Sequence, residues 1–208
     1  MTVPQEVRKI LIPRILMLFV VIGAIFGMAS STRADPVPVG GLWQEFSWTA
    51  AGVFARGCSP ADPGGLGCVP SSGGNSAFAP APPWTFAFGA GGGNLTVTDA
   101  FSIGDSFNIF DFGLLIGMTP TVAQGGNCGD NPVPCLANPL VSHGVFSLLA
   151  GAHSITIQSR VAPFGAGAAY FRTDQNQNVI PEPMSMLLLG TGLLGAFGVV
   201  RRQRKMKR

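Results

Sequence analysis

The sequence predicts an all-β protein in which residues 35–178 form one antiparallel β-sandwich or jelly roll. Three observations support this prediction. Short segments alternate apolar with small or polar residues, which is typical of half-buried strands. Gly-rich turns separate these segments, and the 208-residue chain contains 29 Gly and 17 Pro. No part of this region keeps helical spacing over three turns, which excludes a helix bundle or a coiled coil.

The expected strands follow the alternation along the chain. It is clearest at 46–49, 84–88, 95–98 and 154–158, and further candidates are 106–110, 144–148 and 167–172. Turns between them contain Gly, which permits positive φ, and Asn or Asp, which cap turns. A body of this length can bury one core. We expect that core to contain Trp48, Trp84, Phe86, Phe88, Leu95, Val97, Phe107, Ile109, Ile155, Ile157 and Phe171.

The charged residues are segregated along the chain. Residues 35–180 contain three Arg, no Lys and eight acidic residues, which gives this part a net charge of −5, although the whole chain carries +3. The basic residues flank apolar segments near the two ends instead. Because an acidic body repels phosphate, this distribution excludes nucleic-acid binding.

The N-terminal region has the three parts of a secretory signal peptide. Basic residues precede an apolar segment at 15–29, and small residues follow it. We expect residues 1–34 to be the signal helix, with cleavage after Ala34 and a site near Ser31 as the second choice. An uncleaved N-terminal anchor is the alternative.

A second apolar segment, residues 184–200, contains no charged residue and predicts a transmembrane helix. At ~1.5 Å per residue it spans roughly 25 Å, slightly less than a ~30 Å hydrocarbon core, and flanking Arg side chains can extend to close the difference. The basic tail after it keeps that end in the cytoplasm, so the body lies outside. This tail consists of Arg201, Arg202, Arg204, Lys205, Lys207 and Arg208.

Residues 179–208 resemble the PEP-CTERM sorting signal. Pro181, Glu182 and Pro183 precede the Gly-containing apolar segment, and the basic tail follows it. The resemblance implies a Gram-negative bacterium in which exosortase, a membrane-embedded cysteine transpeptidase, processes the tail near these three residues. It also implies transient anchoring in the inner membrane, then delivery to the cell surface or an exopolysaccharide matrix. A plain C-terminal anchor with a chance Pro-Glu-Pro is the alternative.

The four cysteines predict two disulfides. In an oxidising exported compartment an even number of cysteines indicates pairing. Of three connectivities we favour the local one, Cys58 with Cys68 and Cys128 with Cys135. The spacings do not match the usual zinc pattern, so no metal or other cofactor is expected.

Asp99, Asp105 and Asp111 recur every six residues. If they met at one end of a hairpin, they could hold Ca²⁺ through carboxylate oxygens, together with Asp130 or Asn108. The interpretation we favour is that Asp99 and Asp105 cap turns and that Asp111 is solvated.

No catalytic motif stands out. His143 and His153 are expected to be structural, since no Gly-x-Ser-x-Gly or His-Glu-x-x-His motif occurs, and Glu45 is the only Glu of the body. Three aromatic residues could stack on sugar rings if exposed, but core positions are commoner: Trp43, Trp84 and Tyr170. The sequence therefore predicts a non-enzymatic surface or matrix protein. A carbohydrate-binding module, with or without calcium, is the alternative, and a secreted hydrolase ranks third.

Overall fold

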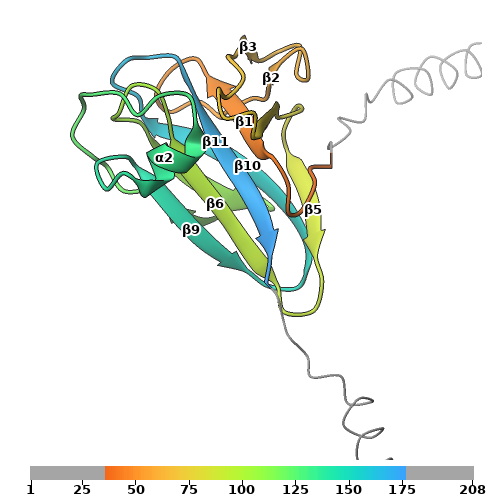
Figure 1. Ribbon diagram of the computed structural model, residues 1–208. Helices are drawn as coiled ribbons and strands as arrows, with labels where there is room; N and C mark the ends of the chain where they lie inside the picture. The colour runs from red at the N-terminus through yellow and green to blue at the C-terminus, as the bar shows by residue number, and fades with distance from the viewer. Residues whose placement is uncertain (1–35, 177–208) are drawn as a thin grey trace, which may run out of the picture. The chain divides into compact units, whose positions relative to one another are not determined.

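Two β-sheets packed face to face form the body of the protein (Figure 1). The computed structural model describes residues 36–176. One short helix, α2 (Pro132–Ala137), lies in the connection between the eighth and ninth strands. The strands are β1 (Trp43–Trp48), β2 (Cys58–Ser59), β3 (Leu66–Gly67), β4 (Ser76–Phe78), β5 (Trp84–Phe88), β6 (Gly93–Asp99), β7 (Ser106–Asp111), β8 (Leu114–Met118), β9 (His143–Leu148), β10 (Gly151–Val161) and β11 (Gly167–Gln175).

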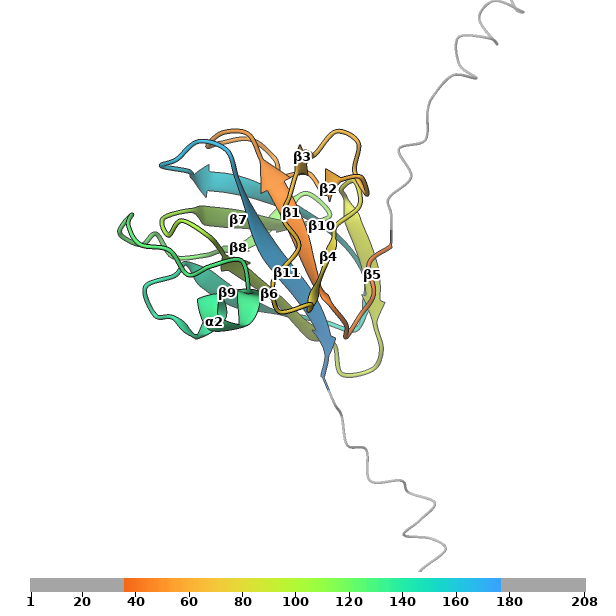
Figure 2. The same cartoon turned by 45° about the horizontal axis from the view of Figure 1, so that its top comes forward.

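Eight strands pair as nested antiparallel hairpins, while β4 runs parallel to β1, and β2 and β3 form a separate parallel pair. β1 pairs with β11, β5 with β10, β6 with β9, and β7 with β8. The five-stranded sheet has the order β4-β1-β11-β6-β9 and the four-stranded sheet the order β5-β10-β7-β8. Figure 2 shows β10 and β7 in the layer behind β1 and β11. This is the arrangement of a jelly roll, and the all-β prediction is confirmed.

The core lies between the two sheets and is rich in aromatic rings. Phe46 makes ring contacts with Trp48, Trp84, Phe107 and Phe171 at centroid distances of 5.4–6.1 Å. Every core residue expected from the sequence is buried in this cluster. The predicted residues occupy the inward-facing positions of their strands, which recur with a period of two. The cluster also contains residues that the prediction left out: Val37, Phe46, Ala55, Ala79, Leu148 and Ala169.

A second cluster covers the outer face of the five-stranded sheet. Trp43 and Tyr170 pack there with Ile103, Cys135 and Val141. The residues that cover this face come from the β6–β7 loop and from the β8–β9 connection with α2 (Figure 1). Segment 57–68 covers the remainder of β1, because Ser47 hydrogen-bonds to Gly57 and Leu66 and Glu45 lies beside Cys58 and Cys68. All six residues of β1 are therefore buried, whereas a two-layer sandwich would leave every second one exposed.

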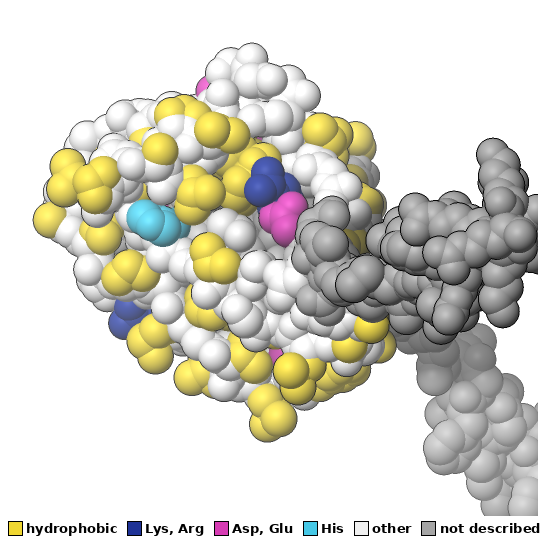
Figure 3. Space-filling view, turned by 60° about the horizontal axis from the view of Figure 1, so that its bottom comes forward, with side chains coloured by type: hydrophobic (Ala, Val, Ile, Leu, Met, Phe, Trp, Pro, Cys, Tyr) yellow, Lys and Arg dark blue, Asp and Glu magenta, His cyan; other side chains and the backbone are white. Residues whose placement is uncertain are grey.

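Strand β8 was not among the strands expected from the sequence. Its side chains do not alternate, and Leu114, Leu115 and Met118 are all more than half exposed. It forms one edge of its sheet and pairs only with β7. Figure 3 shows one face of the body, on which hydrophobic side chains are scattered and charged ones are few.

Both favoured disulfides are present. Cys58 is bonded to Cys68 and Cys128 to Cys135, and the Cα atoms are 5.7 and 5.2 Å apart. The second bridge joins the segment before α2 to the helix itself. For loops this short, each bridge contributes about 2–3 kcal/mol to the free energy of unfolding.

Candidate functional site

The sorting residues lie outside the described part of the chain. This applies to the signal helix 1–34, to Pro181, Glu182 and Pro183, to the apolar segment 184–200 and to the basic tail 201–208. Between residues 36 and 176, no helix has the length and apolar character needed to cross a bilayer. The candidate site described below therefore belongs to the jelly-roll body.

The three aspartates that recur every six residues do not meet. Asp99 and Asp105 lie together at the two ends of the β6–β7 loop, whereas Asp111 is at the far end of β7. Six residues of extended strand correspond to roughly 20 Å. The hypothesis that Asp99, Asp105 and Asp111 meet at one end of a hairpin and hold Ca²⁺ is therefore wrong, because β7 is a continuous strand from Ser106 to Asp111.

The carboxyl group of Asp99 closes the β6–β7 loop. Its Oδ1 accepts a hydrogen bond from the backbone N–H of Ala100 at 2.8 Å, and its Oδ2 accepts from Gly104 and Asp105, both at 3.1 Å. The side chain is fully buried. Burial, followed by the negative charge of Asp105, raises the pKa of Asp99 to about 7, against the lowering effect of the three amides. Asp99 therefore caps a turn, as the favoured interpretation predicted. The other two parts of that interpretation are wrong: the Asp105 side chain accepts no hydrogen bond among the described residues, and the Asp111 carboxylate is not free in solvent, because it contacts His153 and accepts from the N–H of Ser154.

Asp105 sits at the other end of the loop and is buried without a partner. It is 6% exposed, and among the described residues its side chain makes no hydrogen bond or ion pair. Burial raises its pKa to about 6, so the group is mainly ionised at neutral pH. An ionised carboxylate held in this way lowers stability unless a ligand or solvent reaches it.

Asp105 lines a cavity of about 150 Å³ at this end of the sandwich. One wall comes from the β6–β7 loop and the other from the β10–β11 turn with the start of β11. The floor consists of small residues, and the larger lining side chains are Phe101, Ser102 and Phe164. We call this cavity the Asp105 pocket.

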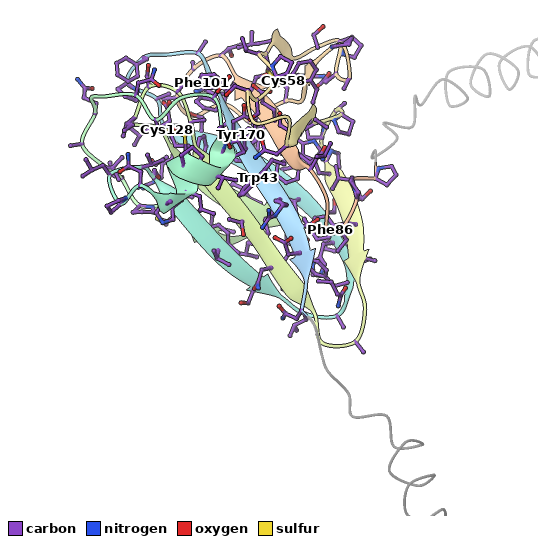
Figure 4. All side chains as sticks on the ribbon, in the orientation of Figure 1. Trp43, Cys58, Phe86, Phe101, Cys128 and Tyr170 are labelled. Atoms are coloured by element: carbon purple, nitrogen blue, oxygen red, sulfur yellow. A yellow bond between two sulfur atoms is a disulfide. The ribbon has the colours of Figure 1, made fainter. Side chains whose placement is uncertain are left out.

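The two phenyl rings of the Asp105 pocket are held differently. Phe101 stacks on Tyr170 with ring centroids 6.4 Å apart, and Figure 4 shows both rings at one end of the sandwich, beside Cys128. The backbone of Phe101 has a φ of 57°, a left-handed conformation that is uncommon for a residue other than Gly. Phe164 lies in the β10–β11 turn and is 54% exposed.

Segment 125–129 fixes the back of this loop. The N–H of Phe101 donates to the carbonyl of Gly129, and the N–H of Cys128 donates to the carbonyl of Phe101, both at 2.8–2.9 Å. The Cys128–Cys135 bridge then ties this segment to α2. The loop that carries the pocket is therefore braced from outside by a disulfide.

His153 occupies a structural position. It is 8% exposed, and its Nδ1 lies 2.7 Å from the Asp111 carboxylate and its Nε2 2.9 Å from the carbonyl of Leu149. A general base needs one free ring nitrogen facing a nucleophile, and here both nitrogens face oxygen acceptors. His143 contacts the carbonyl of Val141 through its Nδ1. Both histidines have the contacts expected of structural residues.

Glu45 is the second buried carboxyl group without a well-formed hydrogen bond. It is fully buried on the outer face of β1, beside Tyr170. Burial raises its pKa to about 7, although the Val69 amide and the Tyr170 hydroxyl oppose this shift. Among residues 36–176, the one group with metal-ligand spacing is Glu45 with Cys58 and Cys68, and both sulfur atoms are already in a disulfide.

The aromatic residues considered for sugar stacking are not available for it. Trp43, Trp84 and Tyr170 are at most 2% exposed. The Trp84 ring packs in the core and its Nε1 donates to the carbonyl of Pro80, while Tyr170 donates to the carbonyl of Asp130. The hypothesis that a sugar stacks on these three rings is therefore wrong, and the core positions that we considered commoner are confirmed, because all three rings pack inside the protein.

Sequence reasoning missed Phe101, Ser102 and Phe164. Nothing in the local pattern marks them, since they come from two loops that are more than 60 residues apart and meet only in the folded chain. The one available signal was Asp99 and Asp105 at the two ends of a Gly-containing loop.

Comparison with known proteins identifies one motif. The family model described as the PEP-CTERM protein-sorting motif matches residues 179–205. No curated protein and no solved structure matches the chain. The resemblance seen in the C-terminal sequence is therefore confirmed.

Proposed function

We propose that this chain, which carries a PEP-CTERM protein-sorting motif, is a non-enzymatic protein of the cell surface or extracellular matrix that associates with exopolysaccharide. The motif implies export, anchoring in the membrane and processing by exosortase. The observation that carries the proposal is the position of this motif directly after an acidic, disulfide-bonded body. Disulfides are typical of exported proteins.

The body supports a role without catalysis. The buried His153–Asp111 pair has a backbone carbonyl at the second ring nitrogen, where a catalytic triad needs a Ser hydroxyl. Glu45 lies under the outer cover of the sheet and does not face another acid across a cleft. These contacts favour structural roles for the residues that a hydrolase would need.

Replacement of Pro181, Glu182 and Pro183 by Ala tests the sorting part of this proposal. In a host that contains exosortase, we expect the variant to remain in the inner membrane and the parent chain to reach the surface. Cell fractionation with detection of the body measures this. Replacement of Pro36 and Pro38, which lie at the other end of the body, is the matched control and should not change delivery. Unchanged surface delivery of the first variant would contradict the sorting role.

A ligand-binding module on the cell surface is the second candidate function. The observation that favours it is the Asp105 pocket, which combines a buried, unpartnered carboxylate with two phenyl rings. The aromatic surface first considered for sugar binding does not contribute, because its rings are buried.

A further inference from the structure

Asp105 is a buried negative charge that lacks a counter-ion. Within residues 36–176, the ion pairs join Arg56 to Asp62, His153 to Asp111 and Arg172 to Asp174. None of them includes Asp105 or its neighbour Asp99. The Asp105 oxygens are not among the fully enclosed, unpaired side-chain atoms of residues 36–176, so the carboxylate keeps some contact with solvent in the pocket. A carboxylate with this little hydration is stabilised by a cation beside it.

The cavity in front of Asp105 is small and mostly apolar. Its volume of about 150 Å³ is enough for a small organic group. Apart from Asp105, the only lining side chain with an oxygen is Ser102. The remaining surface consists of two phenyl rings and of Ala and Gly residues.

This lining discriminates between classes of ligand. Ca²⁺ takes six to eight oxygen ligands, and it would find one carboxylate and one hydroxyl among the lining side chains, so backbone carbonyls and water would have to supply the rest. A neutral sugar would leave the charge of Asp105 uncompensated. A primary ammonium group supplies the missing charge, donates hydrogen bonds to a carboxylate and a hydroxyl, and is attracted to the faces of phenyl rings.

We propose that the Asp105 pocket binds the primary ammonium group of a small organic ligand. Asp105 is the counter-ion, the Ser102 hydroxyl accepts a further hydrogen bond, and Phe101 and Phe164 form the aromatic walls. Alkylamines and amino sugars share this chemistry. This inference rests on the second candidate function and names the class of ligand for it. It does not depend on sorting, so a negative result in the delivery experiment would leave it standing, and a negative binding result would leave the sorting role standing.

Calorimetric titration of the purified full chain in non-ionic detergent at pH 7.5 tests the proposal. The probes are n-propylammonium, glucosamine, N-acetylglucosamine and Ca²⁺. We expect saturable binding of one propylammonium per chain and none of N-acetylglucosamine, which lacks the charge. Binding of glucosamine as well would identify an amino sugar as the ligand source, and binding of propylammonium alone would identify an alkylamine. Binding of Ca²⁺ alone, or of no probe, would overturn the proposal.

Substitutions locate the bound cation. Asp105→Asn should weaken propylammonium binding about tenfold or more, because the charge-assisted hydrogen bond is lost. Glu45→Gln removes another buried carboxyl group and is the control that should bind normally. Phe164→Ala should weaken binding about two- to fivefold, with Phe112→Ala as its control, since both rings are more than half exposed and can be removed without opening the core. Equal affinity in the parent, Asp105→Asn and Phe164→Ala would overturn the proposal.

Discussion

The backbone N–H of Asp105 donates a 3.1 Å hydrogen bond to Oδ2 of Asp99, and this bond brings two buried carboxyl groups into one loop. The two groups have different surroundings. Asp99 accepts three backbone hydrogen bonds, whereas Asp105 accepts none and faces the cavity. Substitution at the two positions should therefore change stability in opposite directions.

Asp105→Asn should stabilise the body at high pH. Burial raises the pKa of Asp105 to about 6, from an ordinary value of 3.8. A carboxyl group with a raised pKa contributes no penalty below its unfolded pKa. Its penalty grows as pH rises from the unfolded value and is complete above the folded value. We expect the substitution to raise the free energy of unfolding by about 1–3 kcal/mol at pH 8 and to change it little at pH 3.5. Denaturant titrations at both pH values measure this, and an equal effect at the two would contradict it.

Asp99→Ala should destabilise the body most clearly at pH 3.5, where the carboxyl group is uncharged in the folded and unfolded chain. Because burial raises the pKa of Asp99 to about 7, relief of the charge penalty should reduce this effect towards pH 8. The change leaves the amides of Ala100, Gly104 and Asp105 without their acceptor inside the protein. Unpaired buried amides of this kind cost about 2–4 kcal/mol together. Denaturant titration gives the magnitude, and hydrogen exchange at the three amides should accelerate. Unchanged exchange at Gly104 and Asp105 would show that Asp99 does not cap the loop.

Glu45→Gln should stabilise the body for the same reason as Asp105→Asn, because it removes a buried negative charge, but in a different pH window. Burial raises the pKa of Glu45 to about 7, from an ordinary value of 4.5. Its penalty therefore develops between about pH 4.5 and 8 and is absent below that range. The free energies of unfolding of the parent and of Glu45→Gln should be similar at pH 4 and should differ increasingly at pH 6 and pH 8. We expect a difference of about 1–3 kcal/mol at pH 8. A constant difference across this range would contradict the assigned pKa.

Loss of the Cys128–Cys135 bridge should loosen the Asp105 pocket. The bridge anchors the segment that exchanges backbone hydrogen bonds with Phe101. Replacing both cysteines by Ser should lower the free energy of unfolding by about 2–3 kcal/mol and accelerate hydrogen exchange at Phe101. The matched variant without Cys58 and Cys68 should lose similar stability but keep slow exchange at Phe101. Equal protection in the two variants would contradict the bracing role.

Strands β5 and β10 were predictable because each buries one face only. Strand β5 begins at Trp84 and ends at Phe88, as the alternation predicted, and β10 extends the predicted 154–158 at both ends. Strand β8 and the six-residue helix α2 were not predictable, since β8 is exposed on both faces and α2 depends on the Asn131 cap and a Pro at its first turn. Local sequence carries little information on such elements.

The candidate site was predictable only in part. The local pairing of the cysteines was favoured among three connectivities and is confirmed. The capping role of Asp99 agrees with its place at the end of a strand. The pocket itself requires Phe101 and Phe164 to meet across the end of the jelly roll, which is a consequence of the nested hairpins. The burial of Trp43 and Tyr170 likewise depends on a covering layer contributed by distant loops.

Intact-mass spectrometry of the protein recovered from the cell surface tests the central claim, export with removal of the C-terminal tail. In cells that contain exosortase, we expect a mass that lacks residues 1–34 and the segment after the Pro-Glu-Pro region, and that is four hydrogens below the all-thiol value. Cells without exosortase should keep the tail attached. A mass that includes residues 184–208 in both kinds of cell would contradict the account.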